Sequence, residues 1–137
     1  MNSTTLRLTE LNLDKLKLLD RVFHHHFNGT GGSTSSNNFA TRHTFTSITP
    51  GWYLICLSFA SGSSTGVRAR LYDSVEADTI ASVSAGTDIG AGGEDMRLVY
   101  LEGNNLDVQT ARASSVGGHA VWRCLHCFML MISDDQP

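Results

Sequence analysis

Residues 50–59 place the strongest limit on how this chain can fold. Their sequence, Pro-Gly-Trp-Tyr-Leu-Ile-Cys-Leu-Ser-Phe, predicts a turn followed by a strand that is apolar on both faces. Because alternate side chains of a strand point to opposite faces, one face carries Trp52, Leu54 and Cys56. The other face carries Tyr53, Ile55, Leu57 and Phe59. A two-layer sandwich covers only one face of each sheet, so we expect another protomer to cover the second face.

The last predicted strand, residues 121–132, has the same character. It is apolar on both faces, with Trp122, Phe128 and Leu130 among its large side chains. We therefore predict that both strands contribute to an interface between protomers. The residues expected there are Trp52, Tyr53, Ile55, Leu57, Phe59, Trp122, Phe128 and Leu130.

The chain from Phe39 onward is typical of an all-β protein. Short strand-like runs alternate with turns rich in glycine, serine and asparagine. The predicted strands cover residues 39–48, 52–60, 67–73, 79–84, 96–101, 106–110 and 121–132. With 137 residues, 41% of them hydrophobic, the chain is long enough for one domain with a core. We predict an antiparallel sandwich or barrel.

The first part of the chain is different. Asn12 can cap a short amphipathic helix over residues 13–23, on which Leu16, Leu19 and Phe23 share a face. A helix this short is marginal in water by itself. We therefore expect it to dock, either on its own sandwich or as an arm on a neighbouring subunit. The residues expected to make this contact are Leu13, Leu16, Leu19 and Phe23.

Residues 24–38 are dominated by glycine, serine and asparagine after three histidines, which predicts a loop or linker. This composition divides the chain into an N-terminal arm and linker, residues 1–38, and a body, residues 39–137.

Three segments of the body carry a resemblance. They are Pro-Gly-Trp-Tyr at 50–53, Val-Arg-Ala-Arg-Leu-Tyr at 67–72 and Leu-Val-Tyr-Leu-Glu-Gly-Asn-Asn-Leu-Asp-Val-Gln at 98–109. On these segments the body resembles the jelly roll of complement globular heads and tumour-necrosis-factor-like proteins, of the kind that phage capsid decoration proteins use. Asn104 stands where that family has aspartate, and residues 127–132 lack its usual glycine. The resemblance implies an antiparallel jelly-roll sandwich packed as a homotrimer, and it identifies no ligand.

Charge and cysteine usage narrow the partners and the compartment. The formal net charge is −3 and the arginines are scattered, which argues against nucleic acid as a partner. No segment approaches the length of a membrane span and the N-terminus has no apolar signal core, so we expect no membrane partner and synthesis in a host cytoplasm. Three cysteines inside apolar runs fit a reducing compartment.

Two side-chain clusters suggest metal binding. His24 and His26 share one face of an extended chain, so one protomer offers at most two ligands, although a trimer axis could gather three copies of one histidine. A solvated or interface-packed segment is the alternative, which we favour. Cys124 and Cys127 face opposite sides of a strand, which favours buried thiols. We predict no metal and no cofactor.

Nothing in the sequence assembles a catalytic set. No serine lies in a Gly-x-Ser-x-Gly elbow, and His43 and His119 have no evident orienting partner. We therefore predict that the protein is not an enzyme.

An oligomeric jelly roll with a contact arm favours a structural role. The leading hypothesis is a homotrimeric capsid decoration (cement) protein that stabilises a bacteriophage head, bound to the major capsid protein at the virion surface. The alternative is a receptor- or glycan-binding tip domain of a phage tail or fibre, which would use loops 61–66, 86–95 and 111–119. These loops are poor in the aromatic anchors that binding tips usually carry. A complement-like module of a larger bacterial complex is a third possibility.

Overall fold

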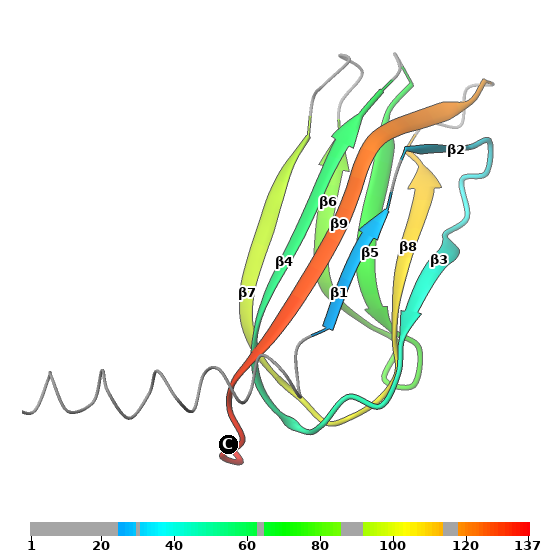
Figure 1. Ribbon diagram of the computed structural model, residues 1–137. Coiled ribbons are helices and arrows are strands. Elements are labelled where there is room, and N and C mark those ends of the chain that lie inside the picture. The colour runs from blue at the N-terminus through cyan, green and yellow to red at the C-terminus, as the bar shows by residue number, and fades with distance from the viewer. Residues whose placement is uncertain (1–24, 30, 63–64, 86–91, 114–117) are drawn as a thin grey trace, which may run out of the picture.

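The computed structural model describes residues 25–29, 31–62, 65–85, 92–113 and 118–137, and these form two antiparallel sheets packed face to face (Figure 1). Sheet A has the order β1 (His25–Gly29), β9 (Ala120–Ser133), β4 (Gly51–Ser61), β7 (Gly92–Leu101), and β2 (Gly32–Thr34) also pairs with β9. Sheet B has the order β3 (Ala40–Phe45), β8 (Leu106–Arg112), β5 (Val67–Asp73), β6 (Asp78–Ala85). The prediction of an all-β antiparallel jelly-roll sandwich is confirmed.

Strand β4 is the central element of the core, as its sequence requires. Its inward side chains Tyr53, Ile55, Leu57 and Phe59 are at most 1% exposed. They pack with the inward residues of sheet B, which on β5 and β6 have small or branched aliphatic side chains: Val67, Ala69, Leu71, Ala81, Val83 and Ala85. The Tyr53 hydroxyl donates to the Thr49 carbonyl oxygen at 2.7 Å, so its buried polar end is satisfied.

The turn between β7 and β8 lies between the predicted strands 96–101 and 106–110, where the sequence is rich in glycine and asparagine. Gly103 has φ +101°, a left-handed conformation that glycine adopts without steric cost. The neighbouring Asn104 amide donates to Asp73 Oδ2 at 3.0 Å, and Asp73 Oδ1 accepts from the backbone N–H groups of Val75 and Glu76. One buried carboxylate therefore links two adjacent turns at this end of the sandwich.

The interpretation of residues 24–38 as a loop is wrong for most of the described part. Residues 25–29 and 32–34 are strands β1 and β2, which pair with the long strand β9. Glycine and asparagine have low strand propensity, but the open edge of β9 supplies partners for their backbone groups. Gly32 is needed there because a Cβ would lie 2.6 Å from the Trp122 ring.

Two further segments were expected to make contacts with partners, the loop 86–95 and the helix 13–23. Strand β7 begins at Gly92, so the end of the expected loop 86–95 is extended strand. The predicted helix at residues 13–23 lies outside the described residues, as do its contact residues Leu13, Leu16, Leu19 and Phe23.

Candidate functional site

The outer face of sheet A, which points away from sheet B, is apolar over half its length. Three strands contribute its side chains in register. Leu54 of β4 lies between Leu98 of β7 and Leu130 of β9. Two residues further along β4, Cys56 lies between Met96 and Phe128. We call this region the outer apolar face: Trp52, Leu54, Cys56, Met96, Leu98, Tyr100, Phe128, Leu130 and Ile132.

The outer apolar face is exposed where a water-facing sheet is normally polar. Met96 is 59% exposed and Leu98 58%, while Trp52, Leu54 and Leu130 are half-buried by their neighbours. Trp52 packs edge-on against Tyr100 with ring centroids 5.7 Å apart. This aromatic pair orders one end of the face before any partner binds.

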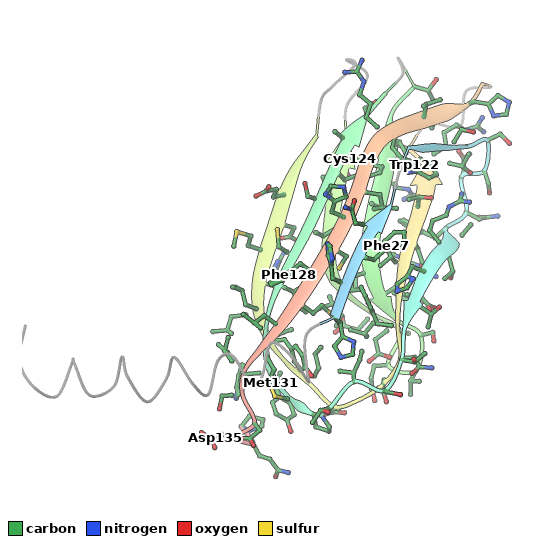
Figure 2. The ribbon with its side chains drawn as sticks, viewed as in Figure 1. Phe27, Trp122, Cys124, Phe128, Met131 and Asp135 are labelled. Atoms are coloured by element: carbon green, nitrogen blue, oxygen red, sulfur yellow. The ribbon has the colours of Figure 1, made fainter. Side chains whose placement is uncertain are left out.

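The same sheet becomes polar toward the other end of β4. There the cross-strand row is Glu94, Ser58, His126 and Asn28, two residues beyond the row of Cys56. Figure 2 shows Phe128 and Cys124 spaced along β9, the first within the apolar half and the second toward the polar end. The apolar region is therefore bounded, which is typical of an interaction surface with a polar rim.

The structure corrects five of the eight residues expected between protomers. Tyr53, Ile55, Leu57 and Phe59 face sheet B, as does Trp122, which is 4% exposed. Their own protomer already covers them, so they cannot also form an outer surface. The strand alternation was predicted correctly, but which of the two apolar faces points inward depends on the position of sheet B.

The remaining three predicted residues, Trp52, Phe128 and Leu130, do lie on the outer apolar face. Their contact with another protomer stays a prediction. Strand β7 also contributes to this face, although none of its residues was predicted there. The alternation of Met96, Leu98 and Tyr100 with Arg97 and Val99 was the available signal.

The histidines and cysteines do not form a metal site in the described part of the chain. His25 and His26 alternate along β1: His25 is half-buried near Phe45, whereas His26 is exposed beside Phe128. Their predecessor His24 lies outside the described residues. Cys124 is half-buried and Cys127 is fully buried, and the structure records all three cysteines as free.

Burial also makes the inward thiol a poor nucleophile. Desolvation, with a smaller contribution from Cys56, raises the pKa of Cys127 to about 12. Burial likewise raises the pKa of Cys56, with Glu94 and Asp95 adding to the shift.

In the part of the chain that the structure describes, no helix has the length and apolar character needed to span a bilayer.

Comparison with known proteins informs the fold. No family model matches the chain, and no curated protein matches its sequence. Among solved structures, the Eiger tumour necrosis factor of S. frugiperda superposes with a TM-score of 0.55 at 10% identity, over 84% of this chain and 95% of that one. The chain therefore has the jelly-roll fold that this structure has.

Two further structures are similar at a lower level. A Bacillus endospore appendage pilus protein gives a TM-score of 0.43 at 10% identity, over 80% of this chain and 89% of that one. A protein of infectious bursal disease virus, Gx strain, gives 0.42 at 11% identity, over 80% of this chain and 32% of that one. At such similarity they carry no argument about function.

Proposed function

We propose that this jelly roll is a structural virion protein that assembles as a homotrimer and decorates a bacteriophage capsid. The observation that carries the proposal is the outer apolar face. Met96 and Leu98 are more than half exposed there, next to the half-buried Leu54, Phe128 and Leu130. Contiguous exposed apolar surface of this kind marks an interaction site.

A second and third copy of the chain are the occupants that best suit this face. The face lies on the outer side of a sheet, and its polar border carries Glu94 and His126 rather than a run of one charge. The family resemblance of residues 50–53, 67–72 and 98–109 implies threefold packing. Each buried leucine or methionine side chain contributes about 1.5–3 kcal/mol of hydrophobic free energy before ordering costs.

The capsid role adds a second contact. The predicted amphipathic segment 13–23 can bury Leu16, Leu19 and Phe23 on the major capsid protein or on a sister subunit. Threefold repetition would turn three weak contacts into strong binding through the high effective concentration of linked sites. The combination of self-assembly and a contact segment supports the proposed placement on a capsid surface.

Recombinant protein tests the proposal in two steps. Its native mass in solution should be about three times 14.9 kDa. Added to empty phage shells, the trimer should bind them and raise their resistance to heat. A chain lacking residues 1–24 should keep the trimer and lose shell binding. Binding to host cells without binding to shells would instead support a receptor- or glycan-binding tip.

A further inference from the structure

The outer face of sheet B, on the opposite side of the molecule from the outer apolar face, carries a ladder of cations and aromatic rings. Arg68, Arg70 and Tyr72 occupy alternate positions of β5, and the Phe39 ring contacts both arginines. The Arg70 guanidinium carbon is 3.8 Å from the centroid of the Phe39 ring and 3.8 Å from that of Tyr72. The corresponding distance from Arg68 to Phe39 is 4.6 Å. Stacking on both faces fixes the plane of the Arg70 fork.

A hydrogen bond also fixes how the Arg70 guanidinium group is rotated within its plane. Arg70 Nε donates to Gln109 Oε1 at 2.8 Å, and the Gln109 amide donates to Thr41 Oγ1 at 3.2 Å. Gln109 is only 9% exposed, so its position is set by the sheet. In the described part of the chain, the two Nη groups of Arg70 have no partner. They form the edge of a guanidinium that matches two oxygens of a carboxylate or phosphate.

Arg68 lines the same cleft as Arg70. Its Nη2 donates to the Asn37 carbonyl oxygen at 2.7 Å, and its buried Nε has no hydrogen-bond partner. Arg112 joins the same loop, because its Nε donates to Asn37 Oδ1 at 3.0 Å. Residues 37–39 therefore contact three arginines: Asn37 binds Arg68 and Arg112, and the Phe39 ring stacks on Arg70.

No described carboxylate forms an ion pair with these arginines. Asp107 lies on the same sheet face but accepts from the Thr44 hydroxyl at 2.7 Å. Desolvation and the like charge of Arg68 lower the pKa of Arg70, with Tyr72 acting in the opposite direction. Unpaired cations held close together attract an anion.

The space beside the ladder suits a small polar ligand. It is a cleft of about 230 Å³ lined by Arg68, Arg70 and Phe39, with hydroxyl groups from Thr79, Ser82 and Ser84. This volume is below the roughly 300–1,000 Å³ of drug-sized pockets and is sufficient for a single acidic group with a small body.

We propose that the Arg68–Arg70 cleft binds an oxyanion, either a carboxylate carried by a small polar molecule or a phosphate. The Nη edge of Arg70 receives two oxygens of the anion, Arg68 supplies the second cation, and the serine and threonine hydroxyls bind the polar body. This site is independent of the proposed trimer, whose contacts lie on the other sheet.

Titration with inorganic phosphate, acetate, glucuronate and glucose tests the proposal, with binding followed by amide shifts in NMR spectra. Phosphate, acetate and glucuronate should give saturable shifts at residues 68–70 and 79–84, and neutral glucose should give none. Tighter binding of phosphate than of acetate and glucuronate indicates a phosphate ligand, and the reverse order indicates a carboxylate ligand.

The variants decide whether the arginines are responsible. Arg70→Gln should weaken anion binding at least about tenfold, and Arg70→Lys should also weaken it because the charge remains but the planar fork is lost. Arg123→Gln removes the same charge from an exposed position on β9 and should leave binding unchanged. Thermal unfolding verifies that each variant is folded. Equal anion affinity in wild type and folded Arg70→Gln, or equal shifts with glucose and glucuronate, would overturn the proposal.

Discussion

Asp95 of β7 accepts a hydrogen bond from the backbone N–H of Ser82 in β6, with 2.9 Å between Oδ2 and the amide nitrogen. Strand β7 is an edge strand of sheet A, and β6 is an edge strand of sheet B. The bond therefore joins the two sheets at an end of the sandwich where both would otherwise have open edges. The other carboxylate oxygen, Oδ1, accepts from Arg97 Nε at 2.8 Å. A single carboxylate therefore satisfies an edge amide and holds a guanidinium.

Replacing this carboxylate should loosen the edge. Asp95→Asn removes the charge and leaves one acceptor oxygen for two donors, so at least one of the two hydrogen bonds is lost. We expect the free energy of unfolding to fall by about 1–2 kcal/mol at neutral pH. Urea denaturation measures the change. Glu94→Gln is the matched control, because its exposed side chain lies on the opposite face of the same strand. Equal losses in the two variants would contradict the role given to Asp95.

The contribution of Asp95 should depend on pH. The hydrogen bond from Arg97 is the main reason why the pKa of Asp95 is lowered; the Ser82 amide adds to this effect, while burial opposes it. A carboxyl with a lowered pKa in the folded state stabilises the fold above its unfolded pKa of about 3.9. This stabilisation is lost as the pH falls through the folded pKa. The stability difference between wild type and Asp95→Asn should therefore be constant above about pH 5 and shrink in more acidic solution.

A charge on the outer apolar face should break the oligomer. Leu98→Glu places a carboxylate at a position that is 58% exposed within one protomer, so the protomer should still fold. The native mass should fall from about three chains to one, as light scattering can measure. Val75→Glu alters a residue that is 70% exposed in the β5–β6 turn, outside the face, and should leave the mass unchanged. A wild-type protein that is already monomeric at high concentration would refute the trimer.

Leu57 and Leu54, which lie on opposite faces of β4, should respond differently to truncation. In the Leu98→Glu background, Leu57→Ala removes a fully buried side chain and should cost about 2–5 kcal/mol of unfolding free energy. Leu54→Ala, on the outer face, should cost the monomer far less and should instead weaken association when Leu98 is retained. A similar loss of monomer stability in both variants would show that the outer leucine is also a core residue.

The two thiols of β9 should differ in reactivity. Cys127 is fully buried and its pKa is raised to about 12, so it should resist alkylation at pH 8 in the native protein and react after unfolding in urea. Cys124 is half-buried and should be alkylated in the folded protein. Mass spectrometry of the peptides assigns the labelled sites. Rapid native labelling of Cys127 would mean that β9 opens locally.

Much of the architecture follows from local sequence. The Pro50-Gly51 turn, the two-sided apolar strand after it and the alternation of residues 67–73 predicted β4 and β5 closely, because side-chain periodicity and turn chemistry act over a few residues. The glycine turn at residue 103 was predicted for the same reason.

The sequence alone determined that β4 and β9 are apolar on both faces, and therefore that something must cover each face. Only the tertiary structure decided that Tyr53 points toward sheet B while Trp52 points outward, because inward and outward differ solely by where the second sheet lies. It also decided that residues 25–29 and 32–34 join β9, since a backbone pairing with a distant strand leaves little trace in side-chain composition. The Asp95–Ser82 bond and the Arg68–Arg70 cleft depend likewise on residues brought together by the fold.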